Sequence, residues 1–539
     1  GGGHRGVERR TFAEFVELCQ RLEATESRSA KARMVAAFMS SLGPEEARAF
    51  AYMLVGRKSG ERGKPINVGW STVQRALSIA EGSVPLDLWG RRLGLLEVWR
   101  ALEELSALEG PGSQEKRVRA LASLFVRCTP EERGWLVRVL TGEMRHGVNH
   151  GVFLEAVAAM LRRDLDEIRY ADMVYSDIGK LAELAVRNEL AAQQVEPMRP
   201  VRPMLAEMCG SPSEALSEHG GTSCFEPKYD GIRLQVHVSG GEVRLFTRRL
   251  RDVTQNLPDV VEAVRREIRC RSAVLDSEAI AVGHDGRPMP FQETVRRVGR
   301  ERELEEALRE LPLALRVFDV LHLDGKATVL MPYLDRRRLL EEFVPPEMLA
   351  PVSRLSDPKE VEELMRRNVE TGNEGLVAKD PRSPYIPGRR GKHWLKLKAS
   401  ETMDVVIVAA EWGHGRRSGW LSNYHLAVYD DASGRFVMVG KTFKGLTDAE
   451  FEEMTRKLLS IAVERQPWGV VVRPEVVVEV AFNEVQRSPR YEGGLALRFA
   501  RIVRIRDDKA PTEVNTLEDL RRVFLRQMER RGASERFSL

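Results

Sequence analysis

The first third of the chain has apolar residues at helical spacing over nearly its whole length, from Thr11 to about Asn188. Its clearest start is Thr11 followed by Glu14, a pair that is typical of a helix capping box. Behind this pair, apolar residues recur about one helical turn apart. They are Phe12, Phe15, Val16, Cys19 and Leu22. The pattern predicts an all-α domain, which we assign to residues 1–195.

Part of the helical pattern occurs twice. Segments 44–56 and 130–142 both begin Pro-Glu-Glu, and both carry a leucine two positions before a final glycine. Each segment follows an apolar run of helical spacing, 34–42 in the first copy and 121–128 in the second. We infer that this part of the chain contains a duplicated helical half.

A glycine-rich, mildly basic loop at 142–151 follows the second copy and breaks the helical pattern. Such a loop can present backbone N–H groups to phosphates. An ordinary turn between two helices is the alternative, and the sequence does not choose between them.

A proline-rich stretch at 195–205 marks the first domain boundary, because proline interrupts helix and stiffens the chain. Beyond it, β-rich and period-2 runs alternate with helical ones, which predicts an α+β domain over residues 196–400. These runs cover 234–238, 243–247, 260–268, 273–282, 315–323 and 376–379.

From Asp404 onward short alternating runs dominate, and about five strands with intervening turns predict a small β-barrel over residues 401–539. The runs cover 405–409, 424–429, 436–439, 476–480 and 497–505. A final helix is predicted to start at Thr516, with Asp519 three positions on. Its apolar stripe is Leu520, Val523, Phe524 and Met528.

Composition narrows the class of protein. A chain of 539 residues is too long for one core, and 42% apolar with 30% charged residues is typical of a soluble globular protein. No apolar run approaches the length of a membrane span, and no secretion signal opens the chain. The five cysteines stand far apart, so we expect reduced core residues in a cytoplasmic protein.

The basic residues are strongly biased towards arginine. Net charge is only +4, yet 16 of the 84 basic residues are lysine and the remainder are arginine. A retained lysine is therefore a candidate for a site that needs an amine, since a guanidinium cannot lose its proton and attack. A GC-rich genome explains the bias itself, but not the positions of the lysines.

The first candidate for chemistry is the segment from Lys228 to Arg233, which reads K-x-D-G-x-R. One interpretation is a hairpin turn at Asp230-Gly231 between two strands. The other is a nucleophilic lysine in a rarer motif. The segment does not decide between them, but six later segments do.

These segments are 246–249, 275–279, 317–321, 374–379, 394–398 and 498–509. With Glu226–Arg233 they make seven segments in a fixed order. In these seven segments the chain resembles the ATP-dependent DNA ligases of the archaeal and eukaryotic replicative type, which are covalent nucleotidyltransferases. The resemblance extends over nearly the whole chain. It implies a helical N-terminal DNA-binding domain, a central α+β nucleotidyltransferase (adenylation) domain and a C-terminal OB-fold.

Transfer of AMP through a covalent intermediate needs a nucleophile whose adduct stays reactive, and the resemblance implies that it is Lys228. Attack at neutral pH requires that its pKa be lowered from about 10.4, which nearby cations and partial desolvation can achieve. Lys379, Lys396 and Lys398 are candidates for those cations. A solvated basic strand is the alternative for these three residues.

Glu278 and Glu374 fall in strand-like apolar runs, where a carboxylate is costly unless it is paired or bound to a metal. Carboxylate oxygens suit Mg²⁺, which would neutralise charge at the α-phosphate. Both are therefore candidate metal ligands, and a salt bridge to a neighbouring arginine is the alternative. Phe318 matches the aromatic residue that stacks on adenine in the family, and a buried core residue is the alternative.

The resemblance implies nucleotide or phosphate contacts for the other motif residues. The nucleotide-binding set is Glu226, Arg233, Arg248, Glu278, Phe318, Arg390 and Lys396, with Arg389 adjacent to Arg390. The phosphate-supporting set is Lys379, Lys398, Arg506, Asp508 and Lys509.

The run 498–509 is predicted to be a final basic strand. Alternation places Arg504 and Arg506 on a face suited to phosphates, and Val503 and Ile505 on a face suited to a barrel core. A basic barrel edge without further function is the alternative.

We therefore expect a monomeric ligase that uses ATP and Mg²⁺ to seal nicks in double-stranded DNA, in replication, repair and recombination. An RNA ligase or a GTP-using capping enzyme shares the lysine motif, and a DNA clamp without catalysis is a further alternative. The chain has no P-loop motif and no four-cysteine zinc module. The sequence leaves open whether ADP, GTP or NAD replaces ATP, whether a sliding clamp binds, and how the domains are arranged.

Overall fold

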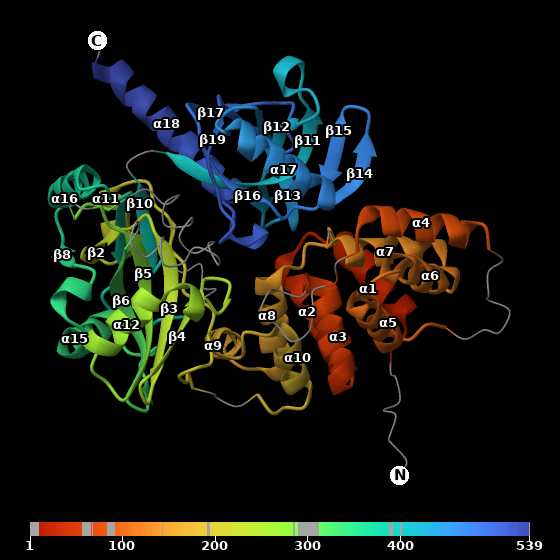
Figure 1. Cartoon of the computed structure of the whole chain (residues 1–539), viewed down its shortest axis with the longest axis horizontal. Helices are drawn as coiled ribbons and strands as arrows, with labels where there is room; N and C mark the ends of the chain where they lie inside the picture. The colour runs from red at the N-terminus through yellow and green to blue at the C-terminus, as the bar shows by residue number, and fades with distance from the viewer. Residues whose placement is uncertain are drawn as a thin grey trace. The chain divides into compact units, whose positions relative to one another are not determined.

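The computed structural model describes residues 10–56, 66, 68–83, 92–142, 144–190, 194–283, 286–288, 312–386, 392–398 and 401–537. Arg390 and its neighbour Arg389 lie outside these residues. The chain divides into two compact units (Figure 1). One contains residues 1–191 together with 402–539, and the other contains residues 192–401.

The described residues from 10 to 190 form helices joined by turns and irregular segments, as their pattern predicted. Its helices are α1 (Phe12–Glu23), α2 (Arg28–Ser40), α3 (Pro44–Val55), α4 (Trp70–Glu81), α5 (Leu95–Ala107), α6 (Ser113–Val126), α7 (Pro130–Thr141), α8 (His150–Leu161), α9 (Leu165–Tyr175) and α10 (Ile178–Val186). The predicted capping box is present, since the Glu14 N–H donates to Thr11 Oγ1 at 3.2 Å. All five apolar residues predicted for α1 are buried. They belong to one core shared by the helices.

The two copies of the repeated sequence form the same local structure. α3 and α7 each begin with proline at their first position, where the missing N–H costs nothing. Each ends at a glycine with positive φ, Gly56 at 86° and Gly142 at 75°. The loop after Gly142 is tied to α3 by His146, which is 3% exposed and whose Nε2 lies 2.8 Å from the Leu54 carbonyl.

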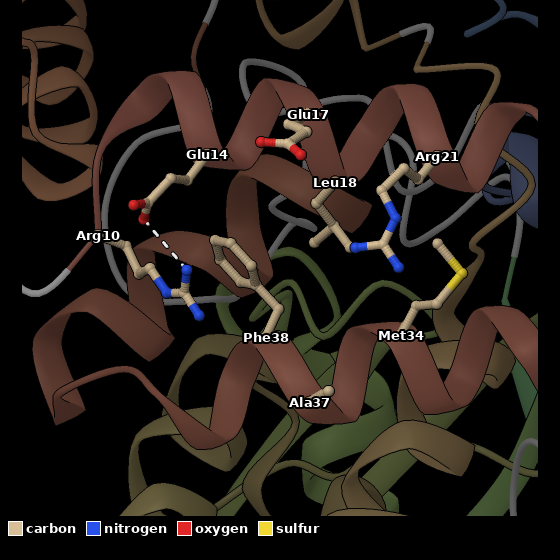
Figure 2. A pocket seen from close by; sticks show the side chains of 8 residues that line it. All are labelled: Arg10, Glu14, Glu17, Leu18, Arg21, Met34, Ala37 and Phe38. Carbon is tan, nitrogen blue, oxygen red and sulfur yellow. Dashed lines mark hydrogen bonds and ion pairs between the residues drawn. The ribbon is translucent and has the colours of Figure 1, made fainter.

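A pocket of about 220 Å³ lies between α1 and α2 (Figure 2). Its lining residues are Arg10, Glu14, Glu17, Leu18, Arg21, Met34, Ala37 and Phe38. Arg10 pairs with Glu14 at 3.3 Å, and its guanidinium lies 5.0 Å from the centre of the Phe38 ring. None of the motif segments between residues 226 and 509 contributes to this pocket.

The C-terminal segment forms a seven-stranded sheet around the long strand β11, which pairs with β12, β15 and β16. The elements are β11 (Thr402–Trp412), β12 (Leu421–Asp430), β13 (Arg435–Thr442), α17 (Asp448–Ser460), β14 (Ala462–Gln466), β15 (Gly469–Val472), β16 (Val477–Ala481), β17 (Glu484–Arg487), β18 (Leu495–Arg498), β19 (Arg501–Ile505) and α18 (Leu517–Phe537). β17 and β18 form a separate pair.

Two predictions for this segment were wrong. The expected strand 497–505 is two strands, because Phe499 has a φ of 54° and ends β18 before β19 begins. The final helix begins as predicted, with the Asp519 N–H donating to Thr516 Oγ1 at 3.1 Å. Its stripe stops short, however, since Leu520 is buried while Met528 is 49% exposed.

The unit of residues 192–401 contains two five-stranded sheets, in the orders β1-β10-β9-β2-β8 and β4-β3-β5-β6-β7. Its elements are β1 (Glu207–Met208), α11 (Pro212–Glu218), β2 (Ser223–Lys228), β3 (Ile232–Ser239), β4 (Glu242–Thr247), α12 (Pro258–Glu267), β5 (Ser272–Ala281), β6 (Leu313–Leu323), β7 (Lys326–Ala327), α15 (Tyr333–Phe343), β8 (Ser353–Leu355), α16 (Pro358–Glu370), β9 (Gly375–Lys379) and β10 (Trp394–Lys398). α11 and α16 pack on the first sheet, and α12 and α15 on the second (Figure 1).

The hairpin alternative for Asp230-Gly231 is wrong, because β2 and β3 belong to different sheets. The chain crosses from one sheet to the other at this point. A Cβ atom on Gly231 would lie 2.2 Å from the Ala279 carbonyl oxygen, so the crossing requires glycine.

The cysteines are all free, and four of them are buried as predicted. Cys270 is an exception, because it is only half-buried. None of the described helices is both long and apolar enough to cross a lipid bilayer.

Candidate active site

Strand alternation gives the sheet of β2, β9 and β10 one polar and one apolar face. Across the sheet, Gly375 on β9 lies opposite Lys228 on β2 on one side and opposite Lys398 on β10 on the other. Val377 pairs with both Glu226 and Lys396, and these directly opposed residues share a face. The opposite face carries Phe225, Leu376, Ala378, Leu395 and Leu397, which form a core with α11 and α16.

The second sheet supplies the facing residues. Arg233 on β3 lies opposite Glu278 on β5, and Glu278 lies opposite Arg316 on β6. Phe318 stands at a bulge, since Val317 and Asp319 pair with consecutive residues of β5. Its ring is half-buried and meets the first sheet, with Lys379 Nζ 4.2 Å from its centre. The core alternative for Phe318 is therefore wrong.

Lys228 is the last residue of β2, where the chain leaves the first sheet for the second. Its ammonium forms an ion pair with the Glu374 carboxylate, and the Glu374 N–H donates to the Lys228 carbonyl at 2.9 Å. The two side chains are 20% and 15% exposed. The structure therefore brings the predicted nucleophile and one predicted metal ligand into direct contact.

Lys379 and Glu226 form a second ion pair at 2.6 Å, with side chains 3% and 2% exposed. Tyr333 donates a hydrogen bond to Glu226 Oε2 at 3.0 Å. Burial raises the pKa of Glu226, and the Lys379 ammonium opposes that shift. Glu226 Oε1 is buried and accepts no hydrogen bond from any described residue, so a ligand can supply the missing donor.

Arg233 forms a third pair. Its guanidinium donates to both oxygens of Asp276, with Nε to Oδ1 at 3.0 Å, and Asp276 is 1% exposed. The guanidinium lies 5.6 Å from the ring centres of both Phe318 and Trp394. The Tyr385 hydroxyl donates to Asp276 Oδ2 at 2.5 Å.

Asp276, Tyr385 and Trp394 were missing from the sequence-based site. Asp276 and Trp394 lie in the quoted motifs, and an acid between Leu275 and Ser277 in a buried strand is a signal for a partner. Tyr385 gave no such signal, because it lies in an irregular segment between β9 and β10.

Three other predicted site residues of this unit are only half-buried. Arg248 is half-buried in the turn after β4. Lys396 and Lys398 are half-buried on the polar face of β10. The solvated-strand alternative does not describe these lysines, because neither of them is exposed.

The C-terminal motif lies in the other compact unit and is largely neutralised there. Arg506 donates to Asp508 at 2.9 and 2.8 Å, and the Lys509 ammonium pairs with Asp404. Arg504 pairs with Glu479 at 3.0 Å, and Arg506 also approaches Glu479. The two arginines thus share a face as predicted.

The prediction that Val503 and Ile505 form the core-facing side of this strand was wrong. Ile502 is 3% exposed and is its core residue, while Val503 and Ile505 are half-buried. The bulge between Glu479 and Val480 on β16 shifts the register and explains the difference.

Comparison with known proteins agrees with this geometry. Three family models match: the ATP dependent DNA ligase domain over residues 203–398, the ATP dependent DNA ligase C terminal region over 417–509, and the DNA ligase N terminus over 90–158. A protein named DNA ligase 1 from Korarchaeum cryptofilum is 40% identical over 543 residues, covering 96% of this chain and 99% of that protein. The chain belongs to the ATP-dependent DNA ligase family.

Other relatives of the ligase include a probable DNA ligase from Anaeromyxobacter dehalogenans (strain 2CP-C), 42% identical over 517 residues, which are 95% of this chain and 99% of the relative. A solved structure named "mycobacterial DNA ligase D complexed with ATP and MES" is 26% identical, with a TM-score of 0.38. The matched region covers 58% of this chain and 97% of the chain in that structure. The ligase is an enzyme that seals DNA through a covalent adenylate with ATP as donor, as its motifs predicted.

Proposed function

We propose that Lys228 carries the adenylate and that the space between the two sheets of residues 192–401 holds ATP. The observation that carries this proposal is the position of Lys228 on the same polar face as Lys379, Lys396 and Lys398, opposite Phe318. A phosphorylated nucleotide needs cations for its phosphates and an aromatic surface for its base. The polar face that carries Lys228 supplies the cations, and its Lys379 lies against the Phe318 ring.

The base site is formed by Phe318, Trp394 and Glu226. Phe318 stacks on adenine, and the free Glu226 Oε1 accepts a hydrogen bond from the adenine amino group. Guanine presents a carbonyl oxygen at that position, which would face a carboxylate. This arrangement favours ATP over GTP. Arg233, Arg248 and Glu278 contact the sugar and phosphates, and Arg390 joins them from outside the described residues.

Glu278 and Glu374 fit a magnesium ion that arrives with the nucleotide. No group of three metal-ligating side chains occurs in the described parts of the chain. Magnesium bound with a nucleotide takes one or two carboxylates and completes its shell with phosphate oxygens and water. When bound, it neutralises charge at the phosphates.

In the first step, Lys228 must lose its proton and attack the α-phosphorus of ATP. A nitrogen–phosphorus bond forms, the bond from the α-phosphorus to the bridging oxygen breaks, and pyrophosphate leaves. Lys379, Lys396 and Lys398 stabilise the negative charge on the phosphates. AMP then passes to the 5′-phosphate at a nick, and the 3′-hydroxyl displaces it to form the phosphodiester bond.

We further propose three domains, at residues 1–195, 196–400 and 401–539, with the C-terminal one an OB-fold. The helical and C-terminal domains bind the nicked duplex through its phosphates. Arg506, Asp508 and Lys509 orient the departing pyrophosphate. The ligase acts as a cytoplasmic monomer in replication, repair and recombination.

The test is adenylation of the full chain with α-labelled ATP, followed by sealing of a nicked duplex. Lys228→Ala should abolish the labelled protein band and reduce sealing from ATP by at least about 10³-fold, because no other residue supplies the attacking nitrogen. Lys359→Ala, which changes an exposed lysine of α16, should retain both activities. Label on another residue, or sealing by Lys228→Ala, would contradict the proposal. Labelled GTP should give no band.

A further inference from the structure

The segment that enters the middle unit, residues 194–205, forms neither helix nor strand, yet polar side chains of the neighbouring sheet bind its backbone. His322 Nδ1 donates to the Val195 carbonyl at 2.9 Å. The Met198 N–H donates to His237 Nδ1 at 2.9 Å. The Gln235 amide binds both backbone groups of Val201, at 2.9 and 2.7 Å.

These side chains are buried, with exposed fractions of 0% for His237, 4% for Gln235 and 6% for His322. Burial lowers the pKa of His237 to about 3, so its ring is neutral. Its Nε2–H donates to Gln235, which leaves Nδ1 to accept from Met198. Because the sheet uses buried polar groups to hold it, the 194–205 segment is a fixed part of the unit.

One further backbone hydrogen bond joins the 194–205 segment to the proposed nucleotide site. The Met204 N–H donates to the Tyr385 hydroxyl oxygen at 3.0 Å. That hydroxyl donates its only proton to Asp276, whose two oxygens accept from the Arg233 guanidinium. The guanidinium also donates to the Tyr385 hydroxyl oxygen, at 3.4 Å. Tyr385 is completely buried, so water cannot replace any of these partners.

We propose that Tyr385 is a positioning residue that couples the 194–205 segment to the nucleotide pocket through Asp276 and Arg233. The Met204 N–H occupies an acceptor site of the hydroxyl and so directs its proton to Asp276. Displacement of the segment frees the hydroxyl to turn and loosens the carboxylate that holds Arg233. By linkage, nucleotide binding to Arg233 stabilises the attached segment to the same extent. This inference rests on the proposed nucleotide contact of Arg233.

Tyr385→Phe tests the coupling, since it keeps the ring against Trp394, at 5.6 Å between centres. It removes all three hydrogen bonds of the hydroxyl, to Met204, Asp276 and Arg233. The KM for ATP in adenylation should rise about 3- to 10-fold, the range of one to two net hydrogen bonds, while kcat changes less than about twofold. Tyr424→Phe is the matched control. It removes a buried hydroxyl that donates to the Leu421 carbonyl at 2.7 Å, and should leave the KM unchanged.

The second measurement is hydrogen–deuterium exchange of the Met204 amide in the full chain, with and without α,β-methylene-ATP, which cannot transfer AMP. In the wild type the analogue should slow this exchange by about threefold or more, and in Tyr385→Phe it should have no effect. Protection that persists in Tyr385→Phe, no protection in the wild type, or an unchanged KM would overturn the coupling. Lys228→Ala should lose adenylation but keep the protection, which separates this inference from the proposed nucleophile.

Discussion

At the scale of single residues, three cations of the proposed nucleotide site each form an ion pair with a carboxylate. Lys228, Lys379 and Arg233 each contact a carboxylate, from Glu374, Glu226 and Asp276 respectively. A buried cation without a partner is costly, so these pairs allow the unit to fold with the cations proposed to bind phosphate in place. Elsewhere burial lowers the pKa of His146 to about 4 and that of His237 to about 3, so these two side chains are buried in the neutral form.

His146 in the helical segment provides a pH prediction. Burial lowers its pKa to about 4. The unfolded chain therefore takes up a proton first, and the stabilisation is complete above pH 6.5 and decreases by about 3 kcal/mol as the pH falls towards 4. Native-state hydrogen exchange at the Val148 amide, which donates to His146 Nδ1 at 3.0 Å, measures this loss.

His146→Gln should be less stable at pH 7 and show a smaller decrease between pH 6.5 and 4. His414→Gln, at an exposed histidine, should match the wild type at every pH. The same pH dependence in His146→Gln would mean that another group is responsible.

At the level of elements, buried ion pairs connect strands and helices that hydrogen-bonded ladders do not join. Arg336 on α15 donates to both oxygens of Asp319 on β6, at 2.7 and 3.0 Å, and both side chains are completely buried. The guanidinium also donates to the carbonyls of Met331 and Ser383. Because Asp319 directly follows Phe318, this cluster holds the bulge that presents the aromatic ring.

Arg336→Met should destabilise the middle unit by about 3–5 kcal/mol, because it leaves a buried carboxylate unpaired. Arg338→Met is the matched control on the same helix, since the Arg338 side chain is 72% exposed and its partner Asp335 has a side chain 43% exposed. Thermal unfolding of the full chain measures both variants, and the transition that ATP shifts upward identifies the middle unit. Equal midpoints for the two variants would show that the buried pair adds no stability.

At the scale of the whole molecule, the residues proposed to hold ATP belong to the unit of residues 192–401, while the C-terminal motif belongs to the other compact unit. Adenylation needs few phosphate contacts, whereas sealing needs a duplex held on both sides of a break. Duplex binding through phosphates releases counterions and therefore depends steeply on salt.

The Kd for a nicked duplex should rise on the order of 100-fold between 50 and 200 mM salt, the change for about four phosphate contacts. Fluorescence anisotropy with a labelled nicked duplex measures this value. The KM for ATP in adenylation serves as the internal control and should change far less over the same range. A Kd that varies by less than about threefold would argue against binding through phosphates.

Much of the local structure was predictable, because it depends on residues close together in the chain. The α1 capping box, the proline starts of α3 and α7 and the alternation of β9 and β10 all follow from spacing alone. The broken strand at Phe499 was not predictable, since the left-handed conformation of a phenylalanine depends on its surroundings.

The sequence by itself determined the family and the order of the motifs, and it named Lys228 as the candidate nucleophile, because these depend on which residues occur and in which order. Only the tertiary structure decided that β2 and β3 separate into two sheets, that Asp276 holds Arg233, and that Tyr385 reaches Met204. These contacts join residues far apart in the chain. They exist only after long-range packing has brought the sheets together, and no periodicity in the sequence encodes them.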